Sequence, residues 1–168
     1  ILIKAINSSN EWVGKSISWL TLLMVITTFI IVILRYVFDL GGIAIQESVS
    51  YMHAMVFMLG AAYTLKHNAH VRVDIFYQRC STKTQAWVDC LGTVFLLMPV
   101  MVFIIWSSWE YVADSWSILE GSRNSGGIPA VYLLKSCIIA MAVLLILQSV
   151  SLFLQNLLVA LGLEQAGN

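Results

Sequence analysis

Charged residues are scarce in this chain. Only nine basic and nine acidic side chains occur among its 168 residues, whereas 60% of the residues are hydrophobic. The mean hydropathy of +0.86 is far above that of a soluble domain of similar length. Because the opposite charges cancel, the chain lacks the basic field that attracts nucleic acid. The composition therefore predicts a membrane protein with no nucleic-acid partner, and with the lipid bilayer as its surroundings.

Formal charges are absent from four long runs of sequence, which are residues 16–34, 48–65, 90–109 and 136–163. Each run reaches the roughly 17–25 residues that a helix needs to cross a bilayer. The first run, with LTLLMVITTFIIVIL, is apolar on every side rather than at alternate positions, which favours helices over the strands of a membrane barrel. We therefore predict an all-α membrane protein, one domain over residues 1–168. Its four transmembrane helices are expected at about 14–37, 44–66, 86–112 and 130–162.

Basic residues are unevenly shared among the predicted connections. Lys4 and Lys15 precede the first span, and Lys66, Arg72, Arg79 and Lys83 lie between the second and third. The other two connections carry only Arg35 and Arg123, together with acidic residues. Because basic connections stay in the cytoplasm, we expect both termini and the central loop to be cytoplasmic. The first span is expected to serve as its own uncleaved insertion signal.

The central loop contains a candidate interfacial helix over residues 67–84. Val73, Phe76, Tyr77 and Cys80 recur there at spacings of three and four, so a helix would gather them on one apolar face. Basic residues would occupy an adjacent face. We predict that this amphipathic helix lies at the headgroup boundary, after Lys66 has ended the second span.

Two charges stand at the ends of the first and second predicted spans. Arg35 ends the first and Glu47 begins the second, and the short turn between them returns the chain to the same depth. Since an unpaired charge facing lipid is costly, we expect Arg35 and Glu47 to pair with each other or with a partner subunit. The candidates for structural or partner contacts are Arg35, Glu47, Lys66, His70, Arg72 and Asp74.

Few residues suit catalysis, metal binding or a cofactor. His70 and Asp74 are four residues apart, a spacing that suits a shared metal, but no cysteine or carboxylate cluster joins them and His67. His53 is the only histidine well inside a predicted span, so a haem with two histidine ligands has no second ligand. Ser50, three residues before His53, is better explained by bonding to its own helix. We expect no catalytic, cofactor-binding or metal-binding residue.

Prolines and tryptophans mark expected bends and ends of helices. Pro99 lies inside the third run and predicts a kink. Pro129 is expected in the first turn of the fourth helix. Trp106, Trp109 and Trp116 gather where the third span leaves the membrane, as residues of an interfacial aromatic belt do.

Four segments together resemble a known family. They are LRYVF (34–38), QE (46–47), FMLGAAYTLKHNAHVRVDIF (57–76) and GGIPAVYLLKS (126–136). In order and spacing the chain is similar, over nearly its whole length, to the DctQ-like small membrane subunit of tripartite ATP-independent periplasmic (TRAP) transporters. The resemblance implies an accessory subunit of the bacterial inner membrane that packs against a large membrane subunit. It implies no catalytic or substrate-contacting residue in this chain.

The resemblance also implies how the whole transporter works. A periplasmic binding protein captures an organic-acid-type solute, and the large subunit carries it inward with sodium. Sodium is then expected in the large subunit rather than in this chain, which needs no cofactor of its own.

Two other kinds of membrane protein fit part of the pattern. A small multidrug-type exporter also has four helices, but it is expected to carry an essential carboxylate deep in its first helix, and the run 16–34 has none. A membrane-anchor subunit of a redox enzyme needs haem ligands, which are lacking as argued above. Both remain as alternatives to an accessory transport subunit.

Overall fold

The computed structural model describes residues 2–70 and 77–163. In chain order its elements are α1 (Leu2–Val37), α2 (Ile43–Lys66), the 3-10 turn η1 (Tyr77–Arg79), α3 (Thr82–Gly92), the π-helical turn η2 (Thr93–Leu97), α4 (Met98–Ser117) and α5 (Val131–Ala160). The two described ranges contain helices and no strand. The predicted all-α class is therefore confirmed.

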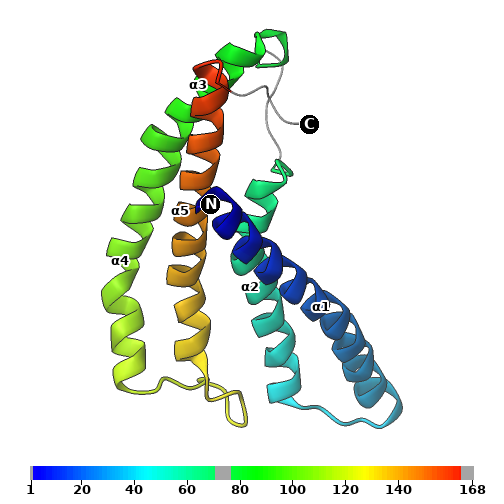
Figure 1. Cartoon of the computed structure of the whole chain (residues 1–168). Coiled ribbons are helices and arrows are strands. Elements are labelled where there is room, and N and C mark those ends of the chain that lie inside the picture. The colour runs from blue at the N-terminus through cyan, green and yellow to red at the C-terminus, as the bar shows by residue number, and fades with distance from the viewer. Residues whose placement is uncertain (1, 71–76, 164–168) are drawn as a thin grey trace.

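The long helices form a bundle in which α5 is the central element (Figure 1). On one side α5 packs against α2, and on the other against α3 and α4. α1 packs chiefly along α2 and contacts α5 through its N-terminal part. The connections 38–42 and 118–130 lie at one end of the bundle, while α3 and the end of α5 lie at the other.

Within the part of the chain that the structure describes, three helices are long and apolar enough to cross a membrane, namely Ile3–Val37, Thr82–Ser117 and Val131–Ala160. The second of these joins α3, η2 and α4 into one continuous helical segment. The predicted span 44–66 coincides with the helix α2, but α2 is not among these three. Its early turns carry Ser48, Ser50, Tyr51 and His53, which make it less apolar than the others.

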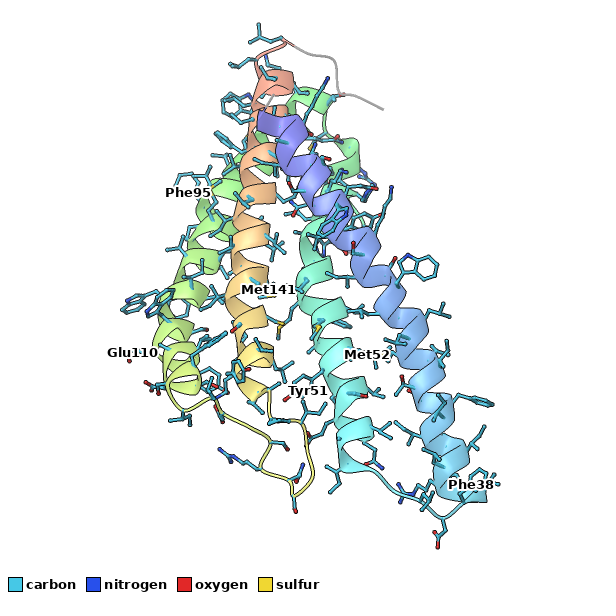
Figure 2. The ribbon with its side chains drawn as sticks, turned by 60° about the horizontal axis from the view of Figure 1, so that its bottom comes forward. Phe38, Tyr51, Met52, Phe95, Glu110 and Met141 are labelled. Atoms are coloured by element: carbon cyan, nitrogen blue, oxygen red, sulfur yellow. The ribbon has the colours of Figure 1, made fainter. Side chains whose placement is uncertain are left out.

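A compact apolar core joins α2, α4 and α5. Its buried members are Ala62, Leu65, Met101, Ala142 and Leu145. Small side chains such as the alanines allow membrane helices to approach closely. Figure 2 shows Met141 on the side of α5 that faces α2.

The third predicted span is interrupted by a turn of π-helix. Thr93–Leu97 widens the helix immediately before α4, and Pro99 follows in the first turn of α4. A proline inside a helix removes one backbone N–H and crowds the carbonyl four residues earlier. A π-helical turn accommodates both effects. A π-helical turn therefore lies on the N-terminal side of Pro99, and the kink expected there stays a prediction.

Pro129 does not lie in the first turn of the last helix, so its predicted place was wrong. α5 begins at Val131 after the N-cap Ala130, whose φ of −144° is not helical. The carbonyl of Ile128 accepts hydrogen bonds from the N–H groups of Ser122 and Ala130. These contacts hold Pro129 in the loop before the helix begins.

The continuous helix predicted over 67–84 is not present in its described flanks. α2 ends at Lys66, and Asn68 follows with a left-handed φ of 50°, which terminates a helix. Between there and the extended N-cap Ser81 of α3, the described residues contain only the short 3-10 turn Tyr77–Arg79. The centre of the predicted helix, with Arg72, Val73, Asp74 and Phe76, lies outside the described residues.

Candidate functional site

Glu47, in the first turns of α2, binds the loop that connects α4 to α5. Its Oε1 accepts hydrogen bonds from Ser122 Oγ at 2.5 Å and Asn124 Nδ2 at 2.9 Å. Its Oε2 accepts one from the backbone N–H of Ile128 at 2.7 Å. Three converging donors stabilise the carboxylate without a cation. Glu47 therefore fixes the start of α2 to this loop.

Gly127 allows this close approach. A Cβ atom at this position would lie 2.4 Å from Ser122 Oγ and 2.7 Å from Glu47 Oε2. Both distances are far below van der Waals contact, so any side chain here would displace the loop from the carboxylate. The QE and GGIPAVYLLKS segments of the sequence are thus in direct contact through Glu47, Gly127 and Ile128.

Arg35, the expected partner of Glu47, is exposed in the last turn of α1. Among the ion pairs formed by the described residues, none joins Arg35 to Glu47. The expected pair within the chain was therefore wrong, because neutral donors of the loop already occupy the carboxylate. A contact of Arg35 with a partner subunit stays a prediction.

Lys66 and His67, at the end of α2, contact Glu11 of α1. The ammonium of Lys66 contacts Glu11 Oε2, and Nε2 of His67 lies 3.0 Å from the same oxygen. Lys15 Nζ lies 3.0 Å from Glu11 Oε1. This cluster gives Lys66 a partner that the sequence analysis did not identify. His67, a candidate metal ligand with His70 on sequence grounds, thus lies beside a carboxylate on another helix. His70 is exposed.

Glu120 and Lys135 form a second ion pair, at the end of the bundle where α4 stops and α5 begins. Lys135 Nζ and Ser115 Oγ, the latter at 2.7 Å, both donate to Glu120 Oε2. The ammonium also lies 3.8 Å from the centre of the Tyr111 ring. The hydrogen bond from Lys135, followed by that from Ser115, lowers the pKa of Glu120. The pair therefore ties the connection 118–130 to α5.

A buried network of amides and a hydroxyl joins α1 to α5. Asn10 Nδ2 donates to Gln148 Oε1 at 2.7 Å, and Gln148 Nε2 donates to Asn7 Oδ1 at 3.1 Å. Ser151 Oγ donates to the same Asn7 oxygen at 2.9 Å. Gln148 is 1% exposed and Asn10 is 2% exposed, so these bonds satisfy groups that water does not reach.

The sequence analysis missed this network, although one signal was present. Gln148, Ser151 and Gln155 recur at spacings of three and four within the uncharged run 136–163. Such spacing places polar side chains on one helical face, which predicts a polar neighbour. Nothing in the sequence identifies Asn7 and Asn10, which lie at the opposite end of the chain, as that neighbour.

A comparison with family models identifies the chain. The model for the DctQ component of tripartite ATP-independent periplasmic transporters matches residues 24–159, from the middle of α1 to the end of α5. The chain belongs to this family. No curated protein and no solved structure gives a match.

The matched range contains two of the contact clusters of this DctQ-family protein. Glu47 with its loop, and Glu120 with Lys135, lie wholly within residues 24–159. The Glu11 ion-pair cluster and the amide network each use residues of α1 that precede this range, namely Glu11, Asn7 and Asn10. The first turns of α1 therefore add contacts to α2 and α5 beyond the matched part of the DctQ-family chain.

Proposed function

We propose that this chain is the accessory small membrane subunit of a TRAP transporter in the bacterial inner membrane. In this proposal it packs against a large membrane subunit and enlarges the scaffold of that subunit in the bilayer. The large subunit binds sodium and carries an organic-acid-type solute that a periplasmic binding protein delivers. Family membership supports the transport role. The division of labour is the proposal.

The use of the charged residues at the helix ends is the structural observation that carries this proposal. Glu47, Lys66 and Lys135 are all engaged with partners inside the chain. Each of these contacts joins two segments that are distant in sequence. Charges used in this way stabilise the architecture of a scaffold, whereas a transport pathway needs ionisable groups that face a substrate or ion.

Uptake into proteoliposomes tests the proposal. We expect no sodium-driven uptake of labelled organic acids with this chain alone, and uptake when the large subunit and the binding protein are also present. Empty liposomes and liposomes with the large subunit alone serve as controls. Uptake by the isolated chain above the level of empty liposomes would contradict an accessory role.

We also infer that α2 is a fourth span and that both termini are cytoplasmic. The 24 residues of α2 extend over about 36 Å, enough to cross the hydrocarbon. Its first turns lie beside the connection 118–130 through Glu47, and its last residue lies beside the polar part of α1 through Lys66. The two ends of α2 therefore coincide with the polar ends of neighbouring helices, as expected of a helix that spans with them.

Labelling in membranes tests this topology. Cys80 is exposed, whereas Cys90 and Cys137 are buried, so a membrane-impermeant thiol reagent should label chiefly Cys80. We expect labelling in inverted vesicles and none in right-side-out vesicles, with Cys80→Ser as the control for specificity. A reporter inserted at Ser122 should be active in the periplasm. Labelling of Cys80 from the periplasmic side would overturn the orientation.

A further inference from the structure

α4 lies at one edge of the bundle and presents an exposed outer face. It packs on α5 and follows directly from η2. On its other side Phe103 is 60% exposed and Trp106 is 76% exposed. Together with Trp109 and Glu110 they line a hollow of about 690 Å³. We call these four residues the α4 outer face; Figure 2 shows Glu110 on the side of the bundle away from α1 and α2.

Glu110 gives this face an ionisable group that forms no ion pair with any residue the structure describes. Its side chain is exposed, and it takes part in none of the ion pairs that the described residues form. Glu110 immediately precedes Tyr111, whose ring contacts the ammonium of Lys135. From Glu110, α4 continues to Ser117, which lies about 10 Å farther along the helix axis. Glu110 thus lies within the aromatic belt, at the depth where Lys135 is already paired.

The exposed face of α1 around Phe29 differs from the α4 outer face because it carries no ionisable group. Phe29 is 65% exposed, about as much as Phe103, and it lies in the run 16–34 that carries no charge. The hydroxyls of Thr27 and Thr28 donate to carbonyls of their own helix. Lipid is sufficient to cover the apolar surface around Phe29, because these two hydroxyls are satisfied within α1. A carboxylate at a similar surface calls for a partner.

We propose that the α4 outer face is the surface that docks the large membrane subunit, and that Glu110 pairs there with a basic side chain on a transmembrane helix of that subunit. The inference rests on the proposed function and adds the location and chemistry of the contact. The hollow beside Phe103 and Trp106 accommodates apolar side chains of the same helix. Burying exposed aromatic side chains with one ion pair among them is typical of energetically dominant interface contacts.

The charge on this face favours a protein helix over lipid. Asp114 is exposed and follows Glu110 by four residues on α4, so both carboxylates lie on the same side of the helix. Phospholipid headgroups carry a phosphate, which two neighbouring carboxylates repel. A single lysine or arginine side chain on a partner helix brings positive charge without an accompanying anion.

Photo-crosslinking from two matched positions tests the location. A photoreactive phenylalanine analogue replaces Phe103 or, as the control, Phe29, in the chain co-expressed with the large subunit. We expect crosslinks to the large subunit from position 103 and none from position 29. If the large subunit co-purifies but crosslinks only to position 29, or if position 103 crosslinks only to lipid, the proposed docking surface is wrong although the complex exists. Absence of the large subunit from the wild-type preparation would overturn the proposed function and this inference with it.

Substitution of Glu110 tests the ion pair. Glu110→Gln should reduce the large subunit recovered with the chain by roughly three- to tenfold, and Glu110→Arg should reduce it further. Neither change should alter the thermal stability of the chain purified alone, because Glu110 forms no ion pair within residues 2–70 and 77–163. Asp39→Asn, at an exposed carboxylate in the connection 38–42, is the control. Recovery of the large subunit at wild-type levels with both Glu110 variants would refute the pairing.

Discussion

Single carboxylates at the ends of these helices are stabilised in different ways. Glu47 accepts hydrogen bonds from two side chains and one backbone N–H, none of them charged. Glu120 instead accepts from the ammonium of Lys135 as well as from Ser115. Hydrogen bonds to the ionised form lower a carboxyl pKa. The stability of the loop 118–130 therefore depends on both groups being charged.

The pH dependence of stability should reveal the contribution of Glu120. Because its folded-state pKa is lowered from the ordinary value of 4.5, the stabilisation is fully present above that value and is lost as the pH falls below it through the lowered pKa. We expect the contribution of this pair to the thermal stability of the detergent-purified chain to disappear as the pH is lowered below about 4.5. Glu120→Gln should lower the stability at neutral pH and reduce this dependence.

A control substitution at Asp39 separates the effect of the Glu120–Lys135 pair from the protonation of exposed carboxylates in general. Asp39→Asn removes an exposed carboxylate from the other connection at the same end of the bundle, and asparagine tolerates its left-handed φ of 53° as well as aspartate does. Its pH profile should match that of the wild type. A Glu120→Gln profile that also matches the wild type would show that the pair with Lys135 contributes nothing measurable.

At the scale of the elements, α1 and α2 are in close contact at Gly14. A Cβ atom there would lie 2.3–2.6 Å from three atoms of the Tyr63 side chain, including its Cβ. Because the contact involves the base of the tyrosine side chain as well as its ring, rotation of the ring alone cannot relieve it. The crossing of the two helices therefore requires glycine at this position.

Gly14→Ala should accordingly destabilise the chain by about 1–3 kcal/mol, the usual cost of overpacking. Gly60→Ala is the matched control, since it adds the same methyl group to α2 where no atom lies within 4 Å. This control should be neutral or stabilise by up to about 1 kcal/mol. Thermal unfolding of the purified variants measures both. Equal stability of Gly14→Ala and wild type would disprove the close crossing.

The positions of most helices could be predicted from the sequence, but their contacts could not. Uncharged runs locate α1, α4 and α5 because crossing a bilayer requires them. They do not show that α1 extends back to Leu2, since Asn7 and Asn10 in its first turns form hydrogen bonds with α5 that the sequence does not reveal. The pairing of Lys66 with Glu11 depends on the angle at which α1 crosses α2, which no local pattern records.

For the candidate residues as well, the sequence predicts depth in the membrane but not the contacts that each residue makes. Arg35 and Glu47 were expected to meet because they end neighbouring runs, and hydropathy gives their depth in the membrane. Depth does not determine which neighbour is reached first. The loop before α5 reaches Glu47 through Gly127 and Ile128, and its fold depends on contacts between residues about eighty positions apart.

At the scale of the whole molecule, the chain combines a bundle held together by contacts between its own helices with a large exposed apolar surface. The buried core lies between α2, α4 and α5, while large aromatic side chains of α1 and α4 remain exposed. Lipid covers part of such a surface in any membrane protein. An accessory subunit must present another part of it to a protein.

The composition of the complex purified from native membranes in mild detergent tests the central claim most directly. With an affinity tag on this chain, the account predicts that a second, larger and very hydrophobic membrane protein co-purifies in a constant ratio through size-exclusion chromatography. A tagged, unrelated membrane protein from the same membranes controls for unspecific recovery. Recovery of this chain alone, or only as copies of itself, under conditions in which the transporter remains active in those membranes would contradict the account.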